Sequence, residues 1–160
     1  MPRPDEVVAR LRDLGVTIAT AESITGGAVC SALVSVPGAS TVVRGGIVAY
    51  TAAMKARLLG VDPDVISEAG LVSEDVAEAM ARGAREATGA TFAVATTGVA
   101  GPEPHDGASP GRVWVAVSGP TGEASSHRDI PGDRTAVRAG TVDAALALVL
   151  ESLAGDVTLL

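Results

Sequence analysis

The chain has almost no aromatic residues: among 160 residues there are one Phe, one Tyr and one Trp, although 47% are hydrophobic. Its core must therefore be built from Ala, Val, Leu and Ile. Such small aliphatic side chains let helices pack closely on a sheet, which favours an α/β fold. A chain of this length is expected to form one domain, residues 1–160, whose core needs neither disulfides nor metal.

Short apolar runs alternate with segments of helical periodicity. Apolar residues at helical spacing predict helices over 5–14, from the glycine turn at 26–27 to about 36, from about one turn before Lys55 to 59, over 63–69 and 73–89, and from about 133 onward. Apolar runs bounded by turn residues predict strands over 16–20, 46–50, 92–97, 112–118 and 124–130, the last two joined as a hairpin. This order predicts a three-layer α/β/α sandwich with a mixed, mostly parallel sheet and a C-terminal hairpin.

Charge and cysteine content exclude several classes of protein. The formal net charge of −7 argues against a nucleic-acid partner, because phosphate binding needs a basic face. Cys30 is the only cysteine, which rules out an internal disulfide and fits a reducing cytoplasm. No spacing typical of zinc ligands occurs, so we expect no metal and no cofactor.

The charged first residues and the short apolar runs predict neither a signal peptide nor a membrane span. The sequence therefore indicates a soluble, cytoplasmic protein. It leaves the oligomeric state open, a homo-oligomer included.

Lys55 is the only lysine among 12 Lys and Arg residues. Lysine can act as a base when it is desolvated or close to other cations, whereas arginine cannot. Tyr50, the only tyrosine, lies five residues earlier at the predicted end of a strand. Both side chains are therefore expected to face one cleft. An exposed surface lysine is the alternative.

Ser40 follows the turn Pro-Gly-Ala at 37–39. A serine needs an adjacent base to become a nucleophile, and lysine can replace histidine in that role. Because His105 and His127 are expected to be exposed, Lys55 is the available base. A turn or capping serine is the alternative.

Two turns that follow predicted strands, and the start of the last helix, carry candidate ligand-binding residues. Backbone N–H groups at a helix start can hold a phosphate or a developing oxyanion, and an arginine can bind a phosphate or carboxylate bidentately. Ordinary caps, turns and a solvated arginine are the alternatives. The candidates are Ser23, Thr25, Gly26, Thr97, Gly98 and Arg134.

Seven short motifs lie along the chain: Thr-Ala-Glu-Ser with Thr-Gly-Gly at 20–27, Val-Pro-Gly-Ala-Ser at 36–40, Gly-Ile-Val-Ala-Tyr at 46–50 followed by Lys55, Gly-Leu-Val-Ser at 70–73, Thr-Thr-Gly-Val-Ala-Gly-Pro at 96–102, Gly-Arg-Val-Trp at 111–114 and Pro-Gly-Asp-Arg at 131–134. In this order they resemble the C-terminal domain of the CinA family, the nicotinamide-nucleotide amidohydrolases called PncC. The resemblance spans nearly the whole chain. It does not extend to the nucleotide-hydrolysing domain that precedes this one in full-length CinA proteins.

The resemblance implies a serine–lysine amidohydrolase that needs no metal or cofactor. Its small-molecule partner would be nicotinamide mononucleotide, which it would convert with water to nicotinic acid mononucleotide and ammonia. The resemblance further implies Ser40 as the nucleophile, Lys55 as its base and Tyr50 as a hydrogen-bonding or proton-transfer partner.

The same resemblance implies that Ser23 and Thr97 line the substrate or oxyanion region and that Arg134 anchors the nucleotide. The chain departs from the family pattern at Ile24, where a cysteine is usual, at Ala39, where a serine is usual, and at 52–54, which lack the usual asparagine. Two other functions stay open. One is a non-catalytic nucleotide-binding or interaction module of the same fold, and the other is an amidase that acts on another small amide.

Overall fold

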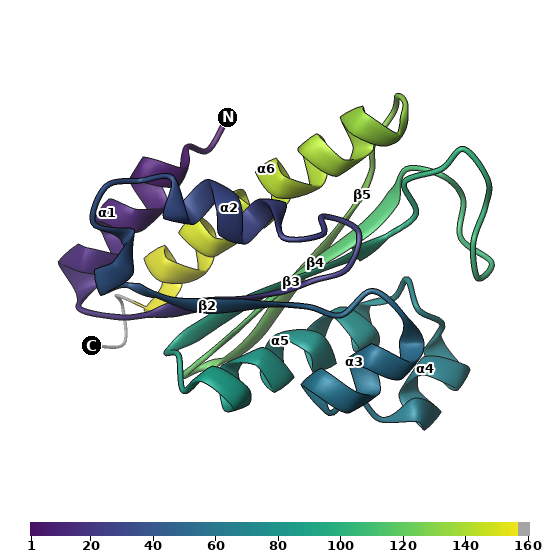
Figure 1. The fold of residues 1–160 in the computed structure, drawn as a ribbon, viewed down its shortest axis with the longest axis horizontal. Coiled ribbons are helices and arrows are strands. Elements are labelled where there is room, and N and C mark those ends of the chain that lie inside the picture. The colour runs from purple at the N-terminus through teal and green to yellow at the C-terminus, as the bar shows by residue number, and fades with distance from the viewer. Residues whose placement is uncertain (157–160) are drawn as a thin grey trace.

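A computed structural model describes residues 1–156 and shows a five-stranded sheet between two layers of helices (Figure 1). The strands are β1 (Ile18–Glu22), β2 (Val43–Val48), β3 (Phe92–Gly98), β4 (Arg112–Gly119) and β5 (Gly122–Asp129). The helices are α1 (Pro4–Leu14), α2 (Ala28–Val34), the short 3₁₀ helix η1 (Ala39–Thr41), α3 (Ala52–Leu59), α4 (Pro63–Ala69), α5 (Glu74–Thr88) and α6 (Arg134–Asp156).

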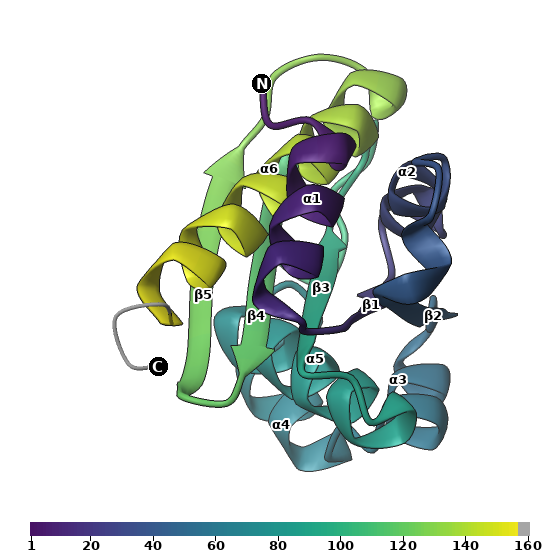
Figure 2. The ribbon, with the colours of Figure 1, turned by 90° about the vertical axis from the view of Figure 1, so that its left-hand side faces the viewer.

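The helices divide between the two faces of the sheet. Helices α1, α2 and α6 cover one face, and α3, α4 and α5 lie on the other, as the two perpendicular views show (Figures 1 and 2). This arrangement confirms the predicted three-layer α/β/α sandwich. None of the described helices is both long enough and apolar enough to cross a lipid bilayer.

The sheet is mixed, with strand order β2-β1-β3-β4-β5. Strand β1 pairs in parallel with β2 and with β3, whereas β4 is antiparallel to both β3 and β5. The sheet is therefore only half parallel, and the prediction of a mostly parallel sheet is wrong in this respect. The physical reason is that no helix lies between β3 and β4, so the chain returns antiparallel instead of crossing over.

Several element boundaries also differ from the prediction. The first strand, β1, covers Ile18–Glu22 rather than 16–20. The second strand, β2, begins at Val43 and ends at Val48, so the predicted strand over 46–50 is shifted, and Tyr50 lies in the loop beyond it. Helix α2 ends at Val34 rather than near 36. The hairpin of β4 and β5 around residues 120–121 is as predicted.

Small side chains set the distance between the sheet and α5. The α5 side of the sheet is lined by Ala19, Ala21, Ala93, Ala95 and Ala116, whereas the α6 side carries Ile18, Phe92, Val94, Val115 and Val117. On α5 itself, a Cβ atom at Gly83 would lie 1.9 Å from the carbonyl oxygen of Leu59. Helices α3 and α5 therefore touch at a separation that only glycine permits, as expected for a core of small residues.

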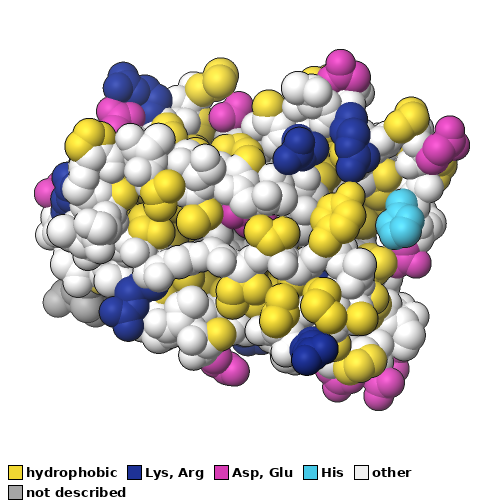
Figure 3. Space-filling view, viewed as in Figure 1, with side chains coloured by type: hydrophobic (Ala, Val, Ile, Leu, Met, Phe, Trp, Pro, Cys, Tyr) yellow, Lys and Arg dark blue, Asp and Glu magenta, His cyan; other side chains and the backbone are white. Residues whose placement is uncertain are grey.

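Several exposed hydrophobic side chains lie around the edge strand β2. Among the large hydrophobic residues that are exposed, Val34, Val48, Tyr50 and Leu58 lie on β2 or on the elements that flank it. On this side of the molecule, apolar side chains gather across the middle and acidic ones lie at the rim (Figure 3).

The turn between β1 and α2 is built on a buried carboxylate. Glu22, the last residue of β1, is 1% exposed. Its two oxygens accept hydrogen bonds from three backbone amides at the start of α2 and from two threonine hydroxyls. The donors are the amides of Gly27 (3.1 Å), Val29 (2.8 Å) and Cys30 (3.0 Å) and the hydroxyls of Thr20 (3.0 Å) and Thr25 (2.7 Å). The carboxylate thus caps α2, where the helix dipole favours a negative charge.

Glu22→Gln should lower the free energy of unfolding by about 2–4 kcal/mol. In glutamine an NH2 group replaces one of the two oxygens, so its N–H groups would face the N–H and O–H donors that now bind Glu22. The negative charge at the helix start would also be lost. Urea unfolding at pH 7 measures the change, and Glu68→Gln, at an exposed site on α4, is the matched control. Equal unfolding midpoints for the two variants would contradict this account of Glu22.

Candidate active site

A cavity of about 580 Å³ opens at the carboxyl ends of β1, β2 and β3. Its lining comes from segments that are far apart in the sequence: the turn after β1, the connection from β2 into α3, the loop between α4 and α5, the loop after β3 and the start of α6. The lining includes Ser23, Ile24, Tyr50, Lys55, Leu71, Thr97, Gly98, His105 and Arg134. Ligand sites in α/β sheets gather at this edge.

Lys55 lies buried at the bottom of this cavity, although lysine side chains are usually exposed. It belongs to the first half of α3, whose N-cap Thr51 accepts a hydrogen bond from the amide of Met54 (3.3 Å). The side chain is 1% exposed, and its Nζ donates to Ser23 Oγ (2.9 Å) and to the backbone oxygens of Ala49 (3.1 Å) and Tyr50 (3.2 Å). Burial lowers the pKa of Lys55 from 10.5 to about 8, because desolvation disfavours the charged amine.

Ser23 provides the hydroxyl group that accepts a hydrogen bond from the Lys55 amine. It directly follows β1, its amide donates to the carbonyl oxygen of Thr96 (3.1 Å), and its side chain is nearly buried. A serine hydroxyl within hydrogen-bond reach of an amine that can be neutral has the geometry of a nucleophile and its base. The arrangement can therefore support acyl transfer.

Ser40 does not reach Lys55. It is exposed in η1, ahead of β2, whereas Lys55 follows β2, and that strand of six residues spans roughly 20 Å. Ser40 lines a separate surface hollow together with Cys30 and Arg44. The predicted pairing of Ser40 with Lys55 is therefore wrong, and the serine beside Lys55 is Ser23.

The sequence contains a signal that points to Ser23, although Ser40 lies closer to Lys55 along the chain. Ser23 is 32 residues from Lys55, and it directly follows a strand that is the parallel neighbour of the strand before Lys55. Carboxyl ends of parallel neighbours lie at one edge of a sheet, so strand order rather than sequence spacing decides which serine meets the lysine.

Tyr50 and Arg134 lie together at the mouth of the cavity. The phenol of Tyr50 is largely exposed, and its hydroxyl accepts a hydrogen bond from Arg134 Nη2 (3.2 Å). Arg134 Nη1 donates to the carbonyl oxygen of Gly101 (3.0 Å). Tyr50 thus faces the same cleft as Lys55, as predicted, but it touches Lys55 only through its backbone oxygen.

The other predicted ligand-binding residues separate into two groups. Thr97 and Gly98 line the cavity, and the hydroxyl of Thr97 donates to the carbonyl oxygen of Leu71 (2.8 Å). Thr25 and Gly26 do not line it. The hydroxyl of Thr25 binds Glu22, and the amides at the start of α2 are already bound to the same carboxylate. The helix start near Gly26, predicted as an anion site, is therefore filled from within the protein.

Asp106, which no sequence motif singled out, secures one wall of the cavity. The loop after β3 carries a tight turn at 105–108, in which Asp106 has a φ of +48° and Gly107 a φ of +76°. This turn directs the carboxylate of Asp106 to the amide of Leu71 (2.6 Å). With Thr97 bound to its carbonyl oxygen, Leu71 is held on both sides against the cavity. An Asp-Gly pair indicates such a turn, but its target is not visible in a sequence.

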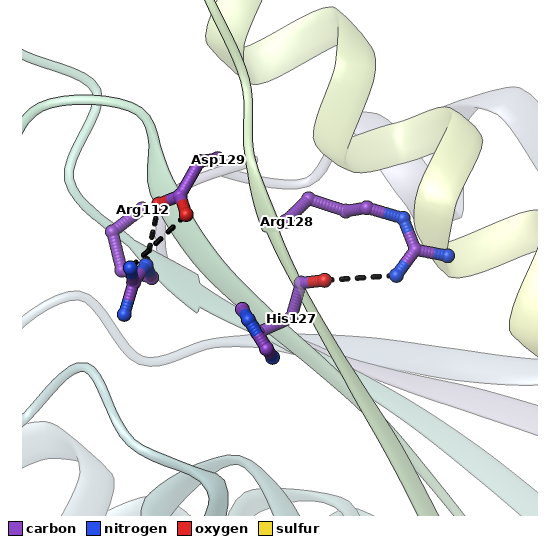
Figure 4. Close-up of polar contacts among 4 residues, drawn as sticks. All are labelled: Arg112, His127, Arg128 and Asp129. Atoms are coloured by element: carbon purple, nitrogen blue, oxygen red, sulfur yellow. Dashed lines mark hydrogen bonds and ion pairs between the residues drawn. The ribbon is translucent and has the colours of Figure 1, made fainter.

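The two histidines occupy different places. His105 lines the outer part of the cavity, whereas His127 lies on β5, beside the Trp114 ring, with a centroid distance of 5.0 Å. Around His127 the polar contacts serve the hairpin: Arg112 pairs with Asp129 across β4 and β5, and the Arg128 side chain binds the His127 backbone oxygen (Figure 4). Both histidines are exposed, as predicted. Within residues 1–156, no group of three or more His, Cys, Asp or Glu side chains could hold a metal ion.

Comparison with known proteins gives consistent relatives. The chain is 46% identical over 142 residues to the nicotinamide-nucleotide amidohydrolase PncC of Pseudomonas putida, a match that covers 88% of this chain and 89% of that protein. It is 45% identical over 152 residues to a putative competence-damage inducible protein of Desulforamulus reducens. That match covers 94% of this chain but 37% of the relative, and a CinA-like protein of Frankia casuarinae is covered to 34%. The chain thus spans about a third of the length of these longer relatives.

Solved structures share the fold. The competence/damage-inducible protein CihA of Agrobacterium tumefaciens superposes with a TM-score of 0.88 at 36% identity, over 94% of this chain and 92% of that one. A competence-damaged protein (CinA) superfamily protein of Escherichia coli gives 0.89 at 34% identity, over 92% and 86%. The family model described as the CinA C-terminal domain matches residues 2–153. This chain belongs to the CinA C-terminal domain family.

Proposed function

We propose that this protein is an amidohydrolase that converts nicotinamide mononucleotide and water to nicotinic acid mononucleotide and ammonia. The observation that carries the proposal is the hydrogen bond between Lys55 Nζ and Ser23 Oγ at the bottom of the cavity. The likeness to a protein named nicotinamide-nucleotide amidohydrolase supports the substrate. In this proposal Ser23 replaces Ser40 as the nucleophile, and Lys55 keeps its role as the base.

The mechanism is acyl transfer in two steps. Neutral Lys55 takes the hydroxyl proton of Ser23 while Oγ attacks the carboxamide carbon, and the resulting ammonium gives that proton to the leaving nitrogen as ammonia departs. A water then attacks the acyl–serine ester, Lys55 accepts its proton, and that proton returns to Ser23 as the carboxylic acid is released. Every proton transfer passes through one amine.

The environment of Lys55 suits this role. Its three hydrogen-bond partners are uncharged oxygens, so no carboxylate in contact with the amine opposes the effect of burial. With a pKa of about 8, roughly a tenth of the lysine is neutral at pH 7. That fraction is some hundredfold or more above that of an exposed lysine.

The mouth of the cavity suits an anionic substrate. Arg134 places a guanidinium beside Tyr50, where it can bind a phosphate while the carboxamide reaches Ser23. The cavity volume falls in the range typical of small-molecule sites. The phenol ring of Tyr50 is available to pack against the ligand rather than to transfer protons, since its hydroxyl accepts from Arg134 and not from Lys55.

Ser23→Ala should lower turnover of nicotinamide mononucleotide by roughly 10³-fold or more, because the attacking oxygen is removed. Ser40→Ala, an equally small change at an exposed serine, should leave turnover within about twofold of the wild type. An ammonia-release assay on both purified variants makes the comparison. If Ser40→Ala loses activity and Ser23→Ala keeps it, the nucleophile is Ser40 and not Ser23.

Lys55→Arg should be almost as inactive as Lys55→Ala, because arginine keeps the charge but cannot give up its proton near neutral pH. In the wild type, kcat/KM should rise with pH, reach half of its maximum near pH 8 and level off above about pH 9, since the reactive form is the neutral amine. Rates from pH 6 to 9.5 and circular dichroism of each variant provide the test. Substantial rescue by arginine would show that Lys55 acts through its charge and not as a base.

Arg134→Ala should raise KM for nicotinamide mononucleotide and lower kcat/KM by about 1.5–3 kcal/mol in transition-state stabilisation. The control is Arg128→Ala, on β5 away from the cavity. Wild type should discriminate strongly against the nucleoside that lacks the phosphate, and the Arg134 variant should not. Equal discrimination in both proteins would show that Arg134 does not bind the phosphate.

A further inference from the structure

A second arginine of α6 holds the turn that carries Ser23. Arg138, one helical turn beyond Arg134, donates from Nε to the carbonyl oxygen of Ile24 (3.1 Å) and from Nη2 to that of Thr25 (3.1 Å). These are the two carbonyl groups that follow Ser23 in the chain. Arg138 does not line the cavity, so the proposed mechanism gives it no contact with substrate.

Most backbone amides of the turn that Arg138 holds donate hydrogen bonds within the protein. From Ser23 to Cys30, all but two of them have acceptors: Ser23 donates to Thr96, Gly26 to the carbonyl of Ser23, Ala28 to that of Thr25, and Gly27, Val29 and Cys30 donate to Glu22. Within the described part of the chain, the amides of Ile24 and Thr25 have no acceptor.

Two adjacent free amides beside a nucleophile call for an explanation. Both residues are buried, at 6% and 0% exposure, and buried N–H groups without an acceptor are rare because they cost free energy. Backbone N–H groups next to the attacking serine are also the usual donors to the oxyanion that forms when an amide is attacked. Of the two residues, Ile24 lines the cavity beside Ser23 and Thr25 does not, so the Ile24 amide is the candidate donor to such a charge.

We propose that Arg138 is a positioning residue for catalysis, which holds the carbonyl groups of Ile24 and Thr25 and so fixes the turn after Ser23 with the Ile24 amide free to bind the oxyanion. This inference rests on the proposed role of Ser23. The Thr25 carbonyl belongs to the same peptide group as the Gly26 N–H, which donates to the Ser23 carbonyl, and the Ser23 carbonyl belongs to the same peptide group as the Ile24 N–H. Arg138 therefore holds the Ile24 N–H through this series of two peptide groups, and its charge polarises the series in the direction that strengthens the Ile24 N–H as a donor.

The chain offers a matched control for a purely structural effect. Arg85 on α5 likewise donates to two backbone carbonyl oxygens, those of Thr91 (2.9 Å) and Gly119 (2.9 Å). Those carbonyls lie at the opposite end of β3 and β4 from the cavity. Loss of either arginine removes two hydrogen bonds to the backbone, but only Arg138 touches the turn of Ser23.

The experiment compares Arg138→Ala, Arg138→Lys and Arg85→Ala with the wild type. For Arg138→Ala we expect kcat on nicotinamide mononucleotide to fall about 10- to 100-fold with KM changed less than about twofold, because oxyanion contacts act in the transition state. Lysine, with one cationic donor group in place of the fork, should give an intermediate kcat. Arg85→Ala should keep kcat within about twofold, whatever its loss in melting temperature.

A second measurement does not depend on the substrate. A fluorophosphonate probe modifies an activated serine through an oxyanion-like state, and intact mass gives the rate of Ser23 labelling, with Ser23→Ala as the blank. We expect labelling to be fastest in wild type, slower in Arg138→Lys and slowest in Arg138→Ala. If this order holds while wild type releases no ammonia from the nucleotide, the proposed substrate fails and the role of Arg138 stands.

Three results would overturn the inference. One is unchanged kcat and unchanged labelling in Arg138→Ala. Another is a loss that appears only in KM, which would make Arg138 a binding residue. The third is failure of wild-type Ser23 to label, or a labelling loss in Arg85→Ala equal to that in Arg138→Ala, which would leave no specific effect at the turn.

Discussion

Parallel pairing of β1 with both β2 and β3 is the constraint on which the rest of the site depends. In this register Glu22 lies opposite Val48 on one side and Thr96 on the other, so β1 and β2 end at the same level and β3 ends two residues beyond it. The next residues of each strand then enter one cavity: Ser23 after β1, the loop before Lys55 after β2, and Thr97 near the end of β3. A shift of one residue in either pairing would turn these side chains to the other face of the sheet.

Two ionisable groups are buried on either side of Ser23, and the fold keeps them apart. Glu22 is surrounded by the amides and hydroxyls at the start of α2, whereas Lys55 contacts only neutral oxygens. An ion pair between them would stabilise the charged amine and raise the pKa of Lys55. Because each group has its own neutral partners, the carboxylate can build the turn while the amine keeps a pKa of about 8. One charge serves structure, and in the proposed mechanism the other is left for proton transfer.

The layers of the fold could be predicted because they follow from local patterns. Apolar periodicity and turn residues determine where helices and strands form. Lys55 could be singled out as the only lysine, without knowledge of the strand order. The partner of Lys55 could not be found in this way, since Ser40 is nearer in sequence but lies at the wrong end of β2. Glu22 and Arg138 resemble ordinary surface charges in a sequence, and only the folded turn shows that their hydrogen bonds converge around Ser23. Patterns in a single sequence do not show which polar groups, distant along the chain, come together in the fold.

The floor and the mouth of the cavity are held by interactions of different strength. The floor is fixed by buried hydrogen bonds around Glu22, Ser23 and Lys55, within sheet registers that allow little movement. The mouth depends on fewer and more exposed contacts, such as Asp106 with the Leu71 amide and Arg134 with Tyr50. Exposed contacts contribute less to stability than buried ones and change with little cost to the fold. In the proposed mechanism, substitutions at the mouth can therefore alter which amide enters the cavity, whereas substitutions at the floor act on the transfer of protons and on the turn that carries Ser23.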